Sequence, residues 1–478
     1  MTRQYHLESV LLPEGWTQNA LVTVAEDGYI SAIEHAGALD TSNLATSGAA
    51  APASTVAPER IDGIVVPGMP NGHSHAFQRG MNGNTEYRLS ARDSFWTWRQ
   101  AMYGLANRIE PADLQILATQ LFVEMLKAGY TSVAEFHYLH RQPDGENYPG
   151  DNALWEATAQ AAAVTGIGLT FLPTLYQTSD FGAQPLKKEQ ARFATETEHF
   201  LRAVERRLDA ERRAAPATRR TGVAFHSLRA VPLDTLRHAA QALRAMDATL
   251  PLHIHVSEQI KEVEACVAHT GRRPIELLLD TGLLDANWCL VHATHANLAE
   301  MQGVAASKAA VCLAITTEAN LGDGFFDAAR FLKFGGRICV GSDSQATVSP
   351  AEELRWMEYQ QRLRKRRRGV LADGKESHAG TRLWRDAALH GAQALGQRTG
   401  EISIGHRADW LVLDRDHPTM VGAPVENALD HLVFAGGDAA IRDVMVAGRW
   451  VVKARHHAAE VPLQGDFAQL MHRLASTP

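Results

Sequence analysis

Two histidines separated by a single residue, His73 and His75, stand at the end of the apolar run 65–70. Side chains at positions i and i+2 of an extended strand point to the same side, so both imidazoles could face one point. Neutral imidazoles are ligands of transition metals, and such a pair is how a metal site can begin. The chain has 22 histidines, so the pair could also arise by chance, and Pro67 and Gly68 could simply mark a turn. A metal site therefore needs partners elsewhere in the chain.

The elements that would position these histidines are strands alternating with amphipathic helices, a pattern that begins at residue 63. In the clearest helix, 113–127, apolar side chains recur at helical spacing, and Gly129 stands where a C-cap belongs. Eight apolar runs, separated by helical segments, predict a closed parallel (β/α)8 barrel of the TIM type. These strand candidates are 64–68, 132–138, 168–175, 223–227, 252–256, 289–292, 310–315 and 337–342.

Short β-like segments also occur at both ends of the chain. We expect residues 1–62 and 400–478 to build one small β-sandwich domain, with a C-terminal tail, beside a barrel domain at 63–399. Residues 41–58 are rich in Ala, Ser, Thr and Pro, which is typical of a loop or a flexible insertion.

The composition is that of an ordinary globular protein, with 45% hydrophobic and 21% charged residues in a chain of 478. A formal net charge of −7 gives no electrostatic reason to expect nucleic acid or an anionic membrane as a partner. The basic run 364–368 follows a helical pattern and is more typical of a solvated helix end. No run approaches the ~20 apolar residues of a membrane span, and the first residues lack the apolar core of a signal peptide.

The cysteines lack the C-x-x-C spacing of a metal or redox motif. Most of them lie in apolar, strand-like runs, so we interpret them as buried thiols in a reducing cytoplasm. They are Cys266, Cys289, Cys312 and Cys339.

Polar side chains collect at one end of the predicted strands, where the active sites of (β/α)8 barrels form. Any one of them could be a satisfied core histidine or a capping aspartate. Their recurrence at the same end of separate strands indicates a metal-assisted enzyme. These strand ends carry His73, His75, His137, Tyr138, His226, Arg229, His253, His255, Glu258, His292 and Asp343.

Four short motifs follow one another along the chain: 69–75 (Met-Pro-Asn-Gly-His-Ser-His), 255–258 (His-Val-Ser-Glu), His292 and 342–343 (Ser-Asp). Their types and order resemble the amidohydrolase superfamily, and specifically its mononuclear deaminases. The resemblance covers nearly the whole chain, including the β domain built from both ends.

Longer strings resemble one branch of these deaminases, which hydrolyses N-formimino-L-glutamate to N-formyl-L-glutamate and ammonia in histidine degradation. These strings are 73–79, 135–140, 226–231 and 316–324. The insertion at 41–58 has no counterpart in that branch.

The resemblance implies a metal bound by His73, His75, His255 and Asp343. Three neutral nitrogens and one carboxylate suit zinc, and they also accept iron, manganese or nickel. The fourth strand ends without a lysine that could bridge two metals, so we expect one metal per chain. His253 lies on the same strand face as His255. We favour His255, because it lies nearer the strand end and at the family's spacing before Glu258.

The resemblance also implies the catalytic roles. A metal-bound water has its pKa lowered toward ~7, and Asp343 is placed to take its proton. Glu258 would protonate the imino nitrogen and later pass a proton to the leaving ammonia. His292 would orient and stabilise the attacking hydroxide.

The implied substrate is a small dicarboxylate, for which the planar fork of arginine is the suitable cation. Arg99 and Arg229 are the candidates, and Gln78, Tyr138 and His226 complete the predicted substrate-binding set. Arg99 lies in the aromatic-rich segment 95–99 and could instead be a packing arginine of an amphipathic helix.

Two alternatives remain open at this stage. One is a deaminase of the same type acting on a purine, pyrimidine or triazine ring, which would need aromatic stacking and not two arginines. The other is a catalytically silent barrel that serves as an assembly scaffold, whose mark would be lost ligands. The resemblance further implies a homodimer.

Overall fold

The computed structural model describes residues 2–35, 57–86, 94–149, 152–214 and 216–476. Of the predicted insertion at 41–58, residues 41–56 lie outside the described residues.

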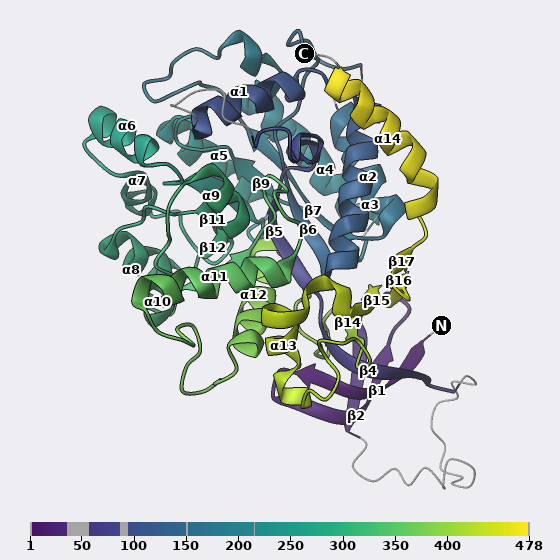
Figure 1. Cartoon of the computed structure of the whole chain (residues 1–478). Helices are drawn as coiled ribbons and strands as arrows, with labels where there is room; N and C mark the ends of the chain where they lie inside the picture. Colours follow the sequence, from purple (N-terminus) through teal and green to yellow (C-terminus); the bar gives the residue numbers. More distant parts are fainter. Residues whose placement is uncertain (1, 36–56, 87–93, 150–151, 215, 477–478) are drawn as a thin grey trace, which may run out of the picture.

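Eight parallel strands form a barrel in which each strand pairs with the next along the chain. Between the last strand and the first, Ser74 and Asp343 form a parallel bridge that closes the ring. Figure 1 shows helices around this barrel and the small β domain beside it. The predicted (β/α)8 fold with a β domain from both chain ends is therefore confirmed. The barrel strands are β5 (Met69–Ser74), β6 (Tyr130–His137), β7 (Gly168–Leu175), β9 (Val223–Phe225), β10 (Leu252–Val256), β11 (Trp288–His292), β12 (Ala310–Leu313) and β13 (Arg337–Val340), and the short β8 (Arg219–Thr221) pairs with β7.

The prediction for the first barrel strand is wrong. Residues 64–68 belong mostly to β4 (Glu59–Pro67), which pairs with strands of the small domain, and the barrel begins at Met69. The chain crosses between the two sheets at Gly68, whose N–H donates to the backbone carbonyl of Asp409. The N–H of Met69 donates to the backbone carbonyl of Gly129. A Cβ at Gly68 would lie 2.2 Å from the Thr131 side chain, so only glycine fits this crossing. Because both strands are buried on both faces, the sequence shows one continuous apolar run.

The small domain is one sheet of eight strands in the order β17-β16-β15-β14-β4-β1-β2-β3. Apolar side chains from both chain ends share its core; Tyr5, for example, meets Trp410 edge to face at 5.4 Å. From this pairing we propose domain boundaries at Gly68 and near Gly400. The remaining strands are β1 (Arg3–Leu12), β2 (Gly15–Val24), β3 (Ile30–His35), β14 (Trp410–Leu413), β15 (Ile441–Val446), β16 (Arg449–Lys453) and β17 (His456–His457).

The helix predicted at 113–127 is confirmed as α2 (Pro111–Ala128), with Gly129 as a left-handed C-cap at φ 103°. The other helices are α1 (Phe95–Ala106), α3 (Ala153–Thr165), α4 (Thr197–Ala214), α5 (Leu233–Met246), α6 (Ile260–Thr270), α7 (Pro274–Asp280), α8 (Leu298–Ser307), α9 (Ile315–Leu321), α10 (Ala328–Lys333), α11 (Pro350–Lys365), α12 (Ala379–Leu395), α13 (Ala428–His431) and α14 (Glu460–Ser476). Short 3-10 or π turns are η1 (Ala76–Met81), η2 (Lys188–Phe193), η3 (Val425–Asn427), η4 (Leu432–Gly436) and η5 (Gly437–Ala440).

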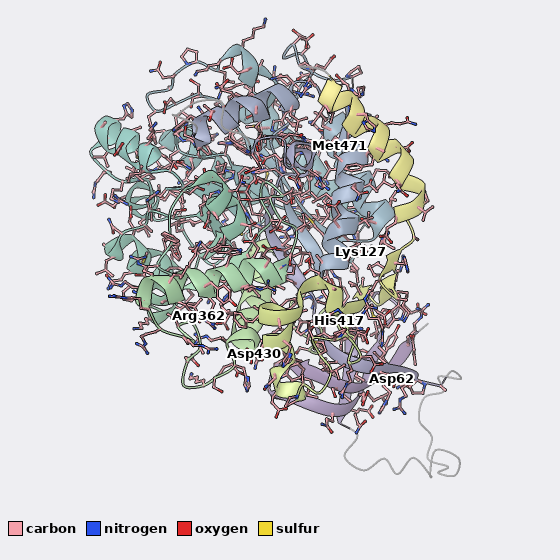
Figure 2. All side chains as sticks on the ribbon, in the orientation of Figure 1. Asp62, Lys127, Arg362, His417, Asp430 and Met471 are labelled. Carbon is pink, nitrogen blue, oxygen red and sulfur yellow. The ribbon has the colours of Figure 1, made fainter. Side chains whose placement is uncertain are left out.

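The C-terminal helix α14 returns from the small domain and lies along α2. Lys127 of α2 pairs with Glu460 at the start of α14, and Arg473 pairs with Asp113 near its end. Figure 2 labels Lys127 and Met471 on these neighbouring helices. No helix within the described ranges is long and apolar enough to cross a membrane.

Two smaller predictions are also confirmed. All four cysteines are free and buried. The basic run 364–368 begins in the last turn of α11, where Arg364 and Lys365 lie within 4 Å of Asp327.

Candidate active site

Three imidazole nitrogens and one carboxylate oxygen converge at the C-terminal end of the barrel. His73 Nε2 lies 3.1 Å from His75 Nε2 and 3.0 Å from His255 Nε2. Asp343 Oδ1 lies 3.3 Å from His73 Nε2 and 3.4 Å from His75 Nε2. All four residues are buried, and one ligand atom of each lies within 4.8 Å of the others. The four predicted ligands therefore meet in one cluster, although three different strands carry them.

Hydrogen bonds to backbone carbonyls fix the orientation of two of these rings. His75 Nδ1 lies 2.8 Å from the carbonyl oxygen of Phe136, and His255 Nδ1 lies 2.9 Å from that of His226. Because a carbonyl oxygen can only accept, each Nδ1 carries the proton and each Nε2 presents its lone pair to the cluster.

The protonation states also suit metal ligands, which must be neutral histidines and an ionised carboxylate. Burial, and then the neighbouring His75, lowers the pKa of His73 to about 3. Burial likewise lowers the pKa of His75 and of His255. Burial alone would raise the pKa of Asp343, but its hydrogen bond with His73 and the nearby histidines lower it.

The donor spacing fits a divalent cation. Tetrahedral coordination with metal–nitrogen bonds of ~2.0–2.1 Å places neighbouring donor atoms roughly 3.3 Å apart. Four of the donor separations, 3.0 to 3.4 Å, match that value, and the other two lie within 4.8 Å. Lone pairs brought this close repel one another, and a shared cation removes the repulsion.

The seam that closes the barrel holds Asp343 in place. Its N–H donates to His73 O over 3.0 Å, and its carbonyl accepts from His75 N over 3.2 Å. Asn71 joins the same seam, since its amide nitrogen donates to Ser342 Oγ over 2.7 Å. Asp343 adopts a φ of 44°, in the left-handed region that costs a non-glycine residue about 1 kcal/mol or more. These bonds to β5 hold the strained residue beside the histidines.

His253, the alternative ligand, lies elsewhere in the barrel interior. Its Nε2 lies 2.8 Å from the carbonyl oxygen of Ala394 at the end of α12.

Glu258 and His292 lie next to the cluster. His292 Nε2 is 3.8 Å from Glu258 Oε1 and 3.7 Å from Asp343 Oδ2, while its Nδ1 is 3.3 Å from Glu318 Oε1. Burial alone would lower the pKa of His292, but these carboxylates, Glu258 foremost, raise it to about 10. Burial raises the pKa of Glu258 to about 7 against the opposing effect of His292. A carboxyl group with a pKa near neutrality can both donate and accept a proton under working conditions.

A cavity opens over this cluster. Every predicted site residue except His73 lines it, and His73 is wholly buried beneath. The wall away from the cluster is largely aromatic and comes from α1, η2 and the end of β7. The residues that line it are His75, Gln78, Phe95, Trp98, Arg99, Met102, Tyr103, Tyr138, Tyr176, Phe193, His226, Arg229, His255, Glu258, His292, Leu321 and Asp343.

The two predicted arginines bring positive charge to this cavity. Arg229 is only 7% exposed, and Arg99 is partly buried with its guanidinium 4.3 Å from the Trp96 ring. Within the part of the chain that the structure describes, neither arginine has a carboxylate within ion-pair distance, and both Nε atoms lack a hydrogen-bond acceptor. Burial alone would lower the pKa of Arg229, but Glu262 nearby raises it. Burial lowers the pKa of Arg99, and the positive charge of Arg229 acts in the same direction.

The predicted neutral groups line the same cavity. Gln78 Nε2 donates to the hydroxyl of Tyr138 over 2.9 Å, and Gln78 Oε1 is buried without a donor among the described residues. The ring of His226 packs 4.5 Å from the Tyr176 ring, while its carbonyl holds His255.

Sequence reasoning assigned no role to several residues that contact this site. Glu318 and Glu262 are buried carboxylates beside His292 and Glu258, and Tyr103 and Tyr176 place their rings in the cavity wall. Glu318 stands in the string 316–324, which could have indicated it. The tyrosines stand in no motif, and only the fold brings them to the cavity.

The profile of the amidohydrolase family matches residues 64–451. The chain therefore belongs to the amidohydrolase family.

Similarity to named relatives is more specific. The chain is 45% identical to formimidoylglutamate deiminase of Pseudomonas aeruginosa over 467 residues, which cover 98% of each chain. It is 27% identical to a 5-methylthioadenosine/S-adenosylhomocysteine deaminase of Natronomonas pharaonis over 82% of each chain. Among solved structures, an amidohydrolase from Brucella melitensis is 37% identical, with a TM-score of 0.87 over 99% of this chain and 100% of the other.

Proposed function

We propose that this chain is a zinc-dependent deiminase that hydrolyses N-formimino-L-glutamate to N-formyl-L-glutamate and ammonia. The observation that carries the proposal is the combination, in one cavity, of a His/His/His/Asp cluster with two arginines that have no carboxylate within ion-pair distance in the described chain. A planar nucleobase or triazine needs neither cation, whereas a dicarboxylate needs both. The similarity to formimidoylglutamate deiminase supports the same substrate.

His73, His75, His255 and Asp343 hold the metal in this proposal. A bound divalent cation supplies Lewis acidity, which lowers the pKa of water toward ~7 so that it can attack near neutral pH. Asp343 Oδ1 faces the histidines, and Oδ2 faces His292 at 3.7 Å, so Oδ2 is available to take a proton from the attacking water.

Glu258 transfers protons in the reaction. Water adds across the C=N bond of the formimino group, and Glu258 protonates the imino nitrogen as the new C–O bond forms. Glu258 then takes the hydroxyl proton of the adduct and passes it to the same nitrogen, so that the C–N bond breaks, the formyl C=O forms and ammonia leaves. The proton held by Asp343 returns to Glu258 and restores both groups. Glu318 holds Nδ1 of His292, and Nε2 of the same ring donates a hydrogen bond to the oxygen that attacks.

Arg99 and Arg229 bind the carboxylates, and Gln78, Tyr138 and His226 line the path to the reacting carbon. Binding energy from these remote groups holds the carbon against the nucleophile.

The test is ammonia release by the purified chain at a measured zinc content. N-formimino-L-glutamate should be a substrate, while adenosine, 8-oxoguanine and a triazine should not release ammonia at comparable rates. A preference for a ring substrate would overturn the proposal.

We also infer a homodimer, supported by the family resemblance, and a cytoplasmic setting, supported by four free cysteines. Light scattering after size exclusion tests the first, and cell fractionation tests the second.

A further inference from the structure

Two tyrosines lie at the arginine end of the cavity. Tyr103 stands one helical turn after Arg99 on α1, so the two side chains share a helix face, with the guanidinium 5.7 Å from the phenol ring. Tyr176 follows the end of β7. Both are nearly fully buried, at 4% and 3% exposed, yet both line the cavity.

A single amide holds both phenols. Gln190 Nε2 donates to Tyr176 Oη over 2.7 Å and to Tyr103 Oη over 3.3 Å. The orientation of this amide is fixed, because Gln190 Oε1 accepts from the backbone N–H of Lys187 over 3.0 Å. Gln190 is itself 2% exposed.

This arrangement leaves phenol hydrogens free for a ligand. Gln190 uses its two amide hydrogens on the phenol oxygens, so each tyrosine acts as an acceptor toward it. Tyr103 also lies within hydrogen-bonding reach of Tyr176, so one O–H can be used between them. Neither O–H has another acceptor among the residues described by the structure, so both can turn to a carboxylate that enters the cavity.

The segment that carries Gln190 is firmly anchored to α1. Asn107 Nδ2, at the C-cap of α1, donates to the carbonyl of Glu189 over 3.0 Å. Arg192 Nη1 donates to the carbonyl of Ile109 over 2.8 Å. The positions of the two phenols relative to Arg99 are therefore set by the packing of η2 on α1.

We propose that Tyr103 and Tyr176, positioned by Gln190, donate to one carboxylate of the substrate beside the arginines and so help to select a dicarboxylate. A neutral donor suits this place, since a third cation would add to the repulsion between Arg99 and Arg229. Hydrogen bonds from a hydroxyl to a carboxylate are short and roughly twice as strong as those between neutral groups. This inference rests on the proposed function for the identity of the dicarboxylate.

The test compares Tyr103→Phe, Tyr176→Phe and the double variant with the wild type on N-formimino-L-glutamate. Each single change should lower kcat/KM about 10-fold or more, the range for a lost hydrogen bond to a charged group, with zinc content unchanged. Tyr130→Phe is the matched control, because Tyr130 is a fully buried tyrosine in the barrel whose hydroxyl has no partner among the described residues. It should keep wild-type kcat/KM.

Analogues with one carboxylate replaced by an amide separate binding from folding. N-formimino-L-glutamine and N-formimino-L-isoglutamine each lack one carboxylate. For the analogue without the contacted group, the Phe variants should match the wild type within about threefold, since no charged acceptor remains for the phenol. Equal losses on all three substrates, or no loss on N-formimino-L-glutamate, would overturn the inference.

Gln190 should act through the phenols. Gln190→Leu should raise KM more than it lowers kcat, and it should add no further loss in the double Phe background. If Gln190→Leu lowers kcat/KM as much in the double Phe background as in the wild type, Gln190 has a purely structural role.

Should the wild type release no ammonia from N-formimino-L-glutamate, the proposed function fails, but the inference remains testable. Calorimetric binding of glutarate should then still be weaker to the double Phe variant than to the wild type. Equal affinities would contradict the inference by itself.

Discussion

His292 Nδ1 lies 3.3 Å from Oε1 of Glu318, so the ring that faces the reaction site is held from behind by a buried carboxylate. Glu318 in turn accepts the backbone N–H of Ala314 over 3.2 Å, which fixes the carboxylate at the start of α9. His292 adopts a φ of 69°, outside the usual range for a side-chain-bearing residue. The pairing with Glu318 therefore decides where Nε2 of this strained residue points.

Replacing Glu318 by Gln should misalign His292 without removing the metal. We expect kcat to fall about 10–100-fold, the usual effect of losing a group that orients an active-site histidine, with a smaller change in KM. Steady-state kinetics on N-formimino-L-glutamate and metal analysis check this. A Glu318→Gln variant with wild-type kcat would remove the orienting role.

The metal ligands can be separated from the alternative histidine by metal content. His73→Ala, His255→Ala and Asp343→Ala should each lose metal and activity, because three donors no longer enclose the cation. His253→Gln should retain about one metal per chain, since glutamine can still donate to the carbonyl of Ala394. Full metal in His255→Ala, or its loss in His253→Gln, would reverse the assignment.

Glu258→Gln should keep fold and metal but lose nearly all turnover, because an amide cannot transfer the protons. Glu264→Gln on the exposed face of α6 is the control and should behave as the wild type. If Glu258→Gln turns over at a near-normal rate, Glu258 has no part in the mechanism.

Glu135 should make stability depend on pH. It accepts hydrogen bonds from Ser74 Oγ at 2.8 Å and Ala76 N at 2.6 Å, and burial raises its pKa from 4.5 to about 8. Between about pH 4.5 and pH 8, Glu135 is protonated in the folded protein but ionised in the unfolded chain. The contribution of Glu135 to the free energy of unfolding therefore falls as pH rises toward 8 and is constant above it. Glu135→Gln removes this titration. The Tm of the variant minus that of the wild type should therefore increase from about pH 5 to about pH 8, and a constant difference would contradict the shift.

The sequence was sufficient to predict the repeating strand–helix pattern of the barrel and the polar residues at the ends of its strands. Seven barrel strands and the convergence of His73, His75, His255 and Asp343 follow from parallel strands that end at one face. The first barrel strand was misplaced, because β4 and β5 are both buried on both faces and join at Gly68 without a polar turn.

The aromatic wall of the cavity was beyond sequence reasoning for a different physical reason. Tyr103, Tyr176 and Gln190 come from a helix, a strand end and a 3-10 turn that are far apart in the sequence. Their meeting depends on how η2 packs against α1, and no local periodicity encodes that packing.

The central claim is that the protein hydrolyses a dicarboxylate substrate in this cavity. The Arg229→Ala variant tests this claim most directly. Arg229→Ala removes a charge-assisted pair at a residue that is 7% exposed. The transition state for N-formimino-L-glutamate should lose about 2–4 kcal/mol of stabilisation, measured as a fall in kcat/KM. Arg237→Ala, on α5, removes a more exposed charge as a control and should have no effect. Metal content should be unchanged in both, and formimino compounds without carboxylates should be poor substrates that the mutation leaves unaffected.

The decisive measurement is the ratio of kcat/KM for N-formimino-L-glutamate between wild type and Arg229→Ala at equal zinc content. A drop of about 30-fold or more, from ~2 kcal/mol upward, is the predicted result. Equal values for the two proteins, or a wild type that prefers a neutral ring substrate, would contradict the account even if the metal site is intact.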